Sequence, residues 1–146
     1  MLFLFLIGCT AYNLLSFRPF YNSIDFQVDK SFTDYQVQEI KNAADLWSFS
    51  NISIKIVNKS KNYIHNTDTI FNGKTVMRRH FIYVNINGYK LGNTDLFFNV
   101  ILHQLGYVMG LGISNYTDSV MNLPSNNKRL QLSIDDILGI LELKYK

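Results

Sequence analysis

Cysteine is almost absent from this sequence, which has a single one, Cys9, among its 146 residues. One thiol cannot form an intramolecular disulfide, and no thiol nucleophile is left if the segment that holds it is removed. A disulfide framework and cysteine catalysis are excluded on that interpretation. Proline is also scarce, with two residues, while 47% of the chain is hydrophobic. This composition is typical of a single globular domain with one sizeable core.

The N-terminal apolar run, residues 2–8 (LFLFLIG), is too short to cross a bilayer, and small residues follow it. This pattern predicts a signal peptide over residues 1–16, and one domain over residues 17–146. We therefore expect a secreted protein with no membrane span after the signal peptide is removed. Two alternatives stay open. The run is an N-terminal core strand, or Leu6-Ile7-Gly8-Cys9 is a lipoprotein box in which Cys9 carries a lipid anchor.

The sequence also lacks an extended stripe of one charge. Its net charge is +3, and its densest basic cluster, Arg78-Arg79-His80, leads into an apolar strand pattern and does not alternate with aromatic residues. Nucleic acid is therefore not expected as a partner.

The hydrophobic pattern predicts a βαβ unit at the start of the domain. Apolar residues alternate with polar ones over residues 24–28, and Thr33 and Gln36 have the spacing of a capping box at a helix start. Residues 52–56 alternate again. A strand that follows a helical crossover is expected to run parallel to the first strand.

The middle of the chain predicts a further strand. Residues 58–74 are polar and end in Asn72-Gly73, which is typical of a loop or hairpin turn. The alternating pattern of residues 81–86, from Phe81 to Ile86, then predicts a strand at the edge of the sheet.

Two helices complete the expected fold. Residues 96–109 are apolar at almost every position, as in a helix enclosed on most sides, and Gly110 is placed to end it. The C-terminal helix is amphipathic, with Ser133 as N-cap and Asp136 as its N3 partner. Asp135 and Asp136 resemble a paired-carboxylate site, but their position at a helix start favours capping and dipole stabilisation.

Residues 103–113 (HQLGYVMGLGI) have the spacing of a zinc-binding helix. Two histidines at i and i+4 lie about 40° apart around a helix and reach one metal. A Glu beside the first histidine acts as general base, and a third histidine follows a helix-ending glycine. In this register His103 stands at the first ligand, Gln104 at the base, Tyr107 at the second ligand, Gly110 at the glycine and Ile113 at the third ligand.

The flanking segments extend this likeness. Residues 119–122 (SVMN) look like a Met-turn, in which Met121 would lie beneath the metal, although Met121 alone would be interpreted as core filler. Residues 93–103 and 132–145 are similar to the segments around the active-site helix and the closing helix of matrixins. Most of residues 20–146 therefore resembles a catalytic domain of the matrixin (matrix metallopeptidase) family, in the metzincin group of zincins.

The resemblance implies an α/β (α+β) fold of the zincin type. Its twisted sheet is mostly parallel with an antiparallel edge strand, and it has three main helices. The activity that the resemblance implies is zinc-dependent cleavage of extended peptides that lie along the edge strand.

The sequence departs from the matrixin pattern at two of the three zinc-ligand positions and at the general base. Only His103 is a normal zinc donor, because the Ile113 side chain has no donor atom and Tyr107 would have to lose a proton with a reference pKa of about 10. The amide of Gln104 cannot act as a base near neutral pH. We expect no cofactor, and zinc only if the domain is an active peptidase. Tyr107 and Ile113 are expected to fill the emptied metal pocket.

His65 and His80 faintly echo a structural metal loop of matrixins. Their spacing does not match that loop, so the favoured interpretation of His80 is a strand-edge residue.

The leading functional hypothesis is a catalytically inactive matrixin-like domain, a pseudopeptidase. It would bind an extended peptide or a protease partner by strand addition at residues 81–86. A divergent active zinc endopeptidase and a purely structural or interaction module are the alternatives.

Overall fold

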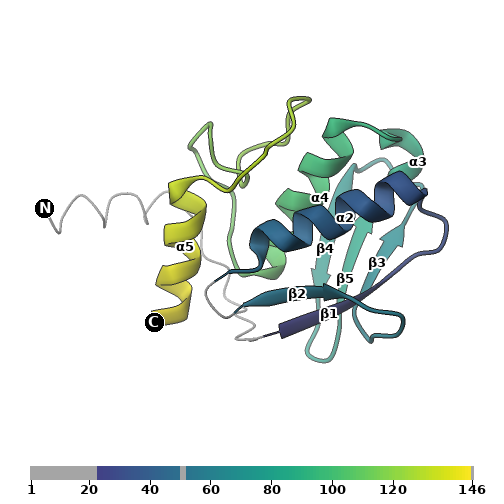
Figure 1. Ribbon diagram of the computed structural model, residues 1–146, viewed down its shortest axis with the longest axis horizontal. Helices are drawn as coiled ribbons and strands as arrows, with labels where there is room; N and C mark the ends of the chain where they lie inside the picture. Colours follow the sequence, from purple (N-terminus) through teal and green to yellow (C-terminus); the bar gives the residue numbers. More distant parts are fainter. Residues whose placement is uncertain (1–22, 50–51, 146) are drawn as a thin grey trace, which may run out of the picture.

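The computed structural model describes residues 23–49 and 52–145, and the sequence folds there into five strands and four helices (Figure 1). The elements follow the order β1 (Ser23–Val28), α2 (Asp34–Trp47), β2 (Ser53–Ile56), β3 (Tyr63–Asn66), β4 (Gly73–Met77), β5 (Ile82–Ile86), α3 (Gly88–Leu91), α4 (Asp95–Val108) and α5 (Ile134–Tyr145). The predicted signal peptide and the anchor at Cys9 lie outside the described residues. None of the helices in the described ranges has the length and apolar character needed to span a membrane.

The five strands form one sheet in the order β2-β1-β3-β5-β4. Strands β2, β1, β3 and β5 are parallel, and β4 pairs antiparallel with β5 at the end of the sheet. The parallel pairing of β1 and β2 across helix α2 confirms the βαβ unit that the sequence predicts. The architecture is the expected α/β fold of the zincin type, with three main helices and the additional short helix α3.

The prediction of a loop over residues 58–74 is wrong. This segment contains β3 and the start of β4. Strand β3 (YIHN) has one fully buried aliphatic residue, Ile64, so its alternation is hidden among polar and aromatic side chains. Two asparagines, one just before the strand and one at its end, hold it in place by hydrogen bonds to backbone groups. Asn62 Oδ1 accepts from the Ile82 N–H, and Asn66 Oδ1 accepts from the Gly88 N–H, both at 2.9 Å.

The predicted edge position of residues 81–86 is also wrong. Strand β5 lies between β3 and β4, and the antiparallel edge strand is β4. The physical reason is that β5 is buried on its core face and shielded on the other: Ile82, Val84 and Ile86 are at most 2% exposed, and Tyr83 and Asn85 are partly buried. Strand β4 (GKTVM) has only partly buried and exposed positions, so its sequence carries no comparable signal.

The core lies between one face of the sheet and helices α2 and α4. Aliphatic and aromatic residues that alternate along the strands point to these helices and form one cluster with them. The helices pack side by side, and the buried indole N–H of Trp47 on α2 donates to the Leu102 carbonyl on α4 at 2.8 Å. This bond satisfies a polar group that would otherwise be costly to bury.

The helix ends follow local sequence signals. Thr33 and Gln36 make the predicted capping box of α2, and the Thr94 hydroxyl caps α4 by accepting from the Phe97 N–H. Helix α4 ends at Val108, and Gly110 has φ of 96°, which favours glycine. The Gly110 and Leu111 N–H groups donate to the carbonyls of Tyr107 and Gly106, both at 3.0 Å. The chain thereby turns away from the helix axis.

Gly106 sets how closely helix α4 approaches the segment that contains Met121. A Cβ atom at Gly106 would lie 2.1 Å from the Met121 Sδ atom and 3.0 Å from Trp47 Cζ2. Met121 and Trp47 are fully buried, so neither can move aside without disturbing the core. The missing side chain therefore fixes residues 119–122 beneath α4.

Candidate functional site

The centre of the site is a contact between His103 and Tyr107 on successive turns of α4. The His103 Nε2 atom lies 3.2 Å from the Tyr107 hydroxyl oxygen, and the two rings meet edge to face with centroids 4.9 Å apart. His103 is 5% exposed and Tyr107 is partly buried. The i, i+4 spacing that would aim two imidazoles at a metal here aims a phenol at an imidazole.

The other nitrogen of His103 fixes the position of the imidazole proton. The Nδ1 atom lies 2.9 Å from the Val120 carbonyl oxygen. Because a carbonyl only accepts, Nδ1 carries the proton and donates it. Burial lowers the pKa of His103, so the ring is neutral and Nε2 presents a lone pair. Burial also raises the pKa of Tyr107, so its phenol keeps the proton that it donates to this lone pair.

These bonds decide how the residues would fit a zinc ion. A histidine that ligates zinc through Nε2 commonly donates Nδ1–H to a carbonyl, and His103 keeps that second interaction with Val120. The lone pair that would bind the metal is instead used by the Tyr107 hydroxyl. Within residues 23–49 and 52–145, no group of three or more His, Cys, Asp or Glu side chains could hold a metal ion. The donor set does not fit a tetrahedral zinc site.

Ile113 does not fill the metal pocket, contrary to expectation. It is 50% exposed and lies three residues after the turn at Gly110. Its neighbours Leu111 and Ser114 are buried, so the backbone stays beside the core and only the side chain of Ile113 faces solvent. Tyr107 alone interacts with the imidazole.

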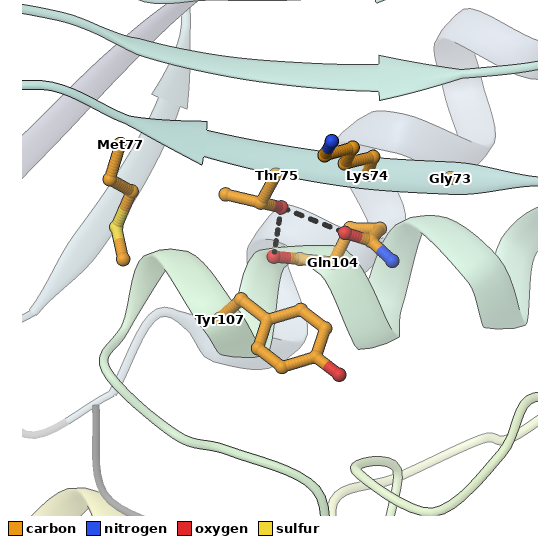
Figure 2. Close-up of a pocket in the computed structure, with 6 residues that line it drawn as sticks. All are labelled: Gly73, Lys74, Thr75, Met77, Gln104 and Tyr107. Carbon is orange, nitrogen blue, oxygen red and sulfur yellow. Dashed lines mark hydrogen bonds between the residues drawn. The ribbon is translucent and has the colours of Figure 1, made fainter. Parts of the chain in front are cut away.

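Gln104 is held against the edge strand. The Thr75 hydroxyl on β4 lies 2.9 Å from Gln104 Oε1 and 3.2 Å from the Gln104 carbonyl oxygen (Figure 2). Gln104 is 7% exposed, and its carboxamide lines a hollow of about 370 Å³ between β4 and α4 that Tyr107 and Met77 also line. An amide in this position can donate and accept hydrogen bonds, but it cannot remove a proton from water.

The free edge of β4 faces outward beside this hollow. The Asn87 N–H donates to the Asn72 carbonyl and the Arg78 N–H to the Phe81 carbonyl, both at 2.9 Å and both in the β4/β5 register. Hydrogen-bonded pairs alternate along an antiparallel ladder, so the N–H and C=O groups of Gly73, Thr75 and Met77 point away from β5. Within the described ranges, no strand pairs with them.

A buried carboxyl group, that of Asp136, forms hydrogen bonds with the segment that contains Met121. Asp136, near the start of α5, is fully buried and accepts from the Ser119 hydroxyl at 2.6 Å and the Val120 N–H at 3.1 Å. It also accepts from the N–H and hydroxyl of Ser133, as its predicted capping role requires. Asp136 therefore anchors the residue whose carbonyl orients His103. Asp135 has a raised pKa through partial burial and the nearby charges of Asp118 and Asp136.

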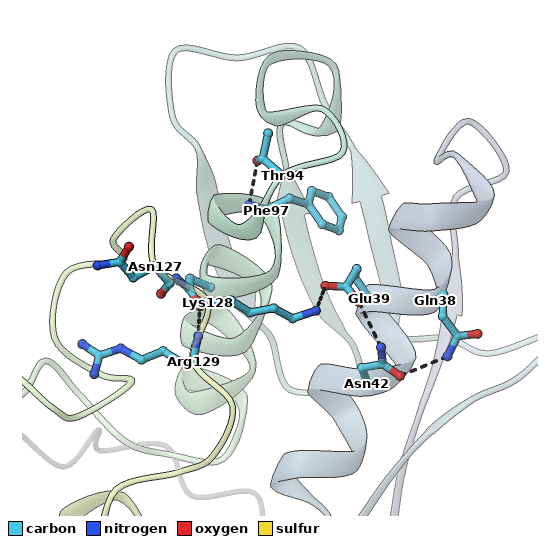
Figure 3. A network of polar contacts seen from close by, with 9 residues as sticks. Gln38, Glu39, Asn42, Thr94, Phe97, Asn127, Lys128 and Arg129 are labelled. Carbon is cyan, nitrogen blue, oxygen red and sulfur yellow. Dashed lines mark hydrogen bonds and ion pairs between the residues drawn. The ribbon is translucent and has the colours of Figure 1, made fainter.

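The loop after Met121 is fixed to two helices. The Asn99 carboxamide on α4 donates to the carbonyls of Ser125 and Asn127, both at 2.6 Å, and accepts from the Arg129 N–H at 2.9 Å. The Lys128 ammonium forms an ion pair with Glu39 on α2 at 2.6 Å (Figure 3). The hydrogen bond to Glu39 raises the pKa of Lys128.

The sequence pattern missed two residues of this site. The partner of Gln104, Thr75, lies in a segment without a clear strand signal. The Val120 carbonyl belongs to the backbone, which a side-chain pattern does not reveal. His65 lies on the other face of the sheet from α4, where it contacts the rings of Tyr63 and Tyr83, and His80, in the turn between β4 and β5, lines a second hollow together with His65.

The comparisons with known proteins agree with this architecture. No curated protein matches the sequence. The family model of the matrixins, however, matches residues 16–145. Because that match covers all the elements described above and nearly the whole chain, the protein belongs to the matrixin family.

Proposed function

We propose that this matrixin domain is a catalytically inactive pseudopeptidase that binds extended peptides at strand β4. The observation that carries the proposal is the bond between the Tyr107 hydroxyl and His103 Nε2. A proton occupies the lone pair that would hold zinc, and the phenol that supplies it is stabilised in its neutral form by burial. The domain is proposed to be extracellular, as matrixins generally are.

Two independent losses support the absence of catalysis. Zinc hydrolases need the metal to lower the pKa of a bound water, and a base to receive its proton. Of the three positions that correspond to the zinc ligands, only that of His103 has a normal zinc donor. The base position holds an amide that is bonded to Thr75. Repair of either defect alone would leave the other.

The test is the zinc content and peptidase activity of the purified chain. We expect zinc well below one ion per molecule after dialysis, and no cleavage of a quenched peptide library above a chelator-treated sample. The reason is the donor set, which has one strong zinc ligand. Near-stoichiometric zinc with turnover that a chelator abolishes would instead establish a divergent active endopeptidase.

Peptide binding needs no metal, because an edge strand supplies main-chain donors and acceptors. The outward groups of Gly73, Thr75 and Met77 lie next to the hollow that Gln104 and Tyr107 line. A peptide added to β4 would place alternate side chains over this hollow. The proposed partner site is thus β4, in place of residues 81–86.

A proline at position 75 tests this role. The Thr75 N–H points to the free edge, so Thr75→Pro removes one donor for a bound peptide and no ladder bond to β5. We expect binding to an array of unstructured decapeptides to weaken about tenfold, a loss of about 1.4 kcal/mol. The matched variant Thr75→Ala keeps the N–H and should bind within about threefold of wild type. Equal binding by both variants, or none by the wild type, would remove β4 as the site.

A further inference from the structure

The sheet has a second face, which the proposed peptide site does not use. Residues that alternate with the core positions point to it, among them Tyr63 and His65 on β3 and Tyr83 on β5. The inward residues Ile64, Val84 and Ile86 pack with α2 and α4 on the opposite side. Within the described part of the chain, no helix packs over the rings on β3 and β5.

Four rings form a continuous row on this face. Tyr63 stacks on His65 with centroids 4.3 Å apart, and Phe81 stacks on Tyr83 at 4.5 Å. The two pairs meet where His65 contacts Tyr83 at 5.0 Å, with their planes nearly perpendicular at 87°. Together they line a hollow of about 590 Å³. The two ring pairs therefore meet nearly at a right angle and form two adjoining sides of the hollow.

Hydrogen-bonding groups complete the wall. Gln27, Ser60, Lys61 and His80 line the same hollow. Ser60 is held in place, because its hydroxyl donates to the Asp25 carbonyl at 2.9 Å and its N–H to Gln27 Oε1 at 3.3 Å. Aromatic walls with a few fixed polar groups are typical of small-molecule and oligomer subsites. Apolar C–H faces of a ligand would contact the rings, whose faces carry negative charge density.

Cationic side chains outnumber carboxylates around the hollow. Lys61 lines it, and Lys59, Arg78 and Arg79 are exposed cations close in sequence to its lining residues, against two carboxylates, Asp25 on the same face and Asp29 next to His65. The Arg78 N–H bonds the Phe81 carbonyl at 2.9 Å, which places the basic turn beside the ring row. This pattern attracts an anionic ligand.

We propose that this aromatic hollow binds an anionic saccharide chain, such as a sulfated or carboxylated glycan. A sugar unit presents C–H groups on its faces, which complement the aromatic rings. Its hydroxyls lie around its edge, where they complement the polar residues. Acidic substituents complement the surrounding cations. Single-stranded nucleic acid, a polyanion whose bases stack on aromatic rings, is the competing occupant, and the dT decamer below tests it.

The test uses the full chain and isothermal titration with three probes: a heparin-derived hexasaccharide, neutral cellohexaose and a dT decamer. The sulfated hexasaccharide should bind most tightly, and added salt should weaken it. Tyr83→Ala should weaken binding about tenfold, whereas Tyr89→Ala, at an exposed tyrosine of α3, should leave it unchanged.

A second pair of variants keeps the test valid if the Tyr83→Ala variant misfolds. Lys61→Ala changes an exposed side chain and should weaken binding about fivefold, while Lys41→Ala on α2 should have no effect. No saccharide binding, or equal losses in the Tyr83 and Tyr89 variants, would overturn the proposal. Tighter binding of the dT decamer than of the hexasaccharide would also overturn it, in favour of nucleic acid.

Discussion

The variant Gln104→Glu/Tyr107→His/Ile113→His is expected to bind zinc more tightly than the native chain by more than about 10⁴-fold. Loss of an outer-shell partner already costs about 10- to 100-fold in affinity, so each restored direct ligand should contribute at least the upper value. Tyr107→His also removes the hydroxyl that occupies His103 Nε2. The Val120 carbonyl stays in place to orient the imidazole. Competition with a chromophoric chelator measures the change.

Two single variants separate the causes. Tyr107→Phe frees the lone pair of His103 without adding a donor, and it should gain little affinity. Tyr107→His supplies two donors on α4 and should gain an intermediate amount. If the triple variant keeps the native circular dichroism spectrum and still binds zinc no better than wild type, position 113 does not reach the site and the assigned register is wrong.

Asp136→Ala is expected to lower the free energy of unfolding by about 3–5 kcal/mol. The side chain is fully buried and accepts four hydrogen bonds, two of them from the backbone N–H groups of Val120 and Ser133. Hydrogen bonds to a charged group are worth about 1.5–3 kcal/mol each, and the truncated site leaves its donors buried without an acceptor. Urea denaturation at pH 7 measures the loss, which corresponds to a fall in Tm of about 10 °C.

The matched control lies one residue earlier. Asp135 is only partly buried, and the charges of Asp118 and Asp136 repel its ionised form, as the raised pKa of Asp135 reflects. Asp135→Asn removes this repulsion and should leave the stability at pH 7 unchanged or slightly higher. If the two variants destabilise the domain equally, the effect belongs to the helix start in general and not to the bonds that Asp136 makes.

Much of the fold could be predicted from patterns that repeat along the chain. Strands β1 and β2 alternate clearly, and the caps at Thr33 and Ser133 mark helix starts. Strands β3 and β4 could not be predicted, because neither buries a row of aliphatic residues. Their places depend on pairing with β5 and on asparagine side chains that bond the backbone of distant residues. The error about the sheet edge follows from this gap.

The chemistry assigned to the site comes from the sequence, whereas its geometry could not be predicted from it. The sequence alone indicates that Gln104 is no base and that Ile113 is no ligand. It does not reveal that Tyr107 donates to His103, that Thr75 holds Gln104, or that Ile113 lies at the surface. These facts depend on the direction of side chains and on where the chain turns after Gly110.

The loop fixed by Asn99 and by the Lys128–Glu39 ion pair has a consequence for recognition. It exposes Leu123 and Leu130, which are 75% and 80% accessible, on a segment without regular secondary structure. Because anchors on two helices hold this segment, Leu123 and Leu130 are presented in a preformed arrangement, and a molecule that contacted them would have little loop ordering to impose.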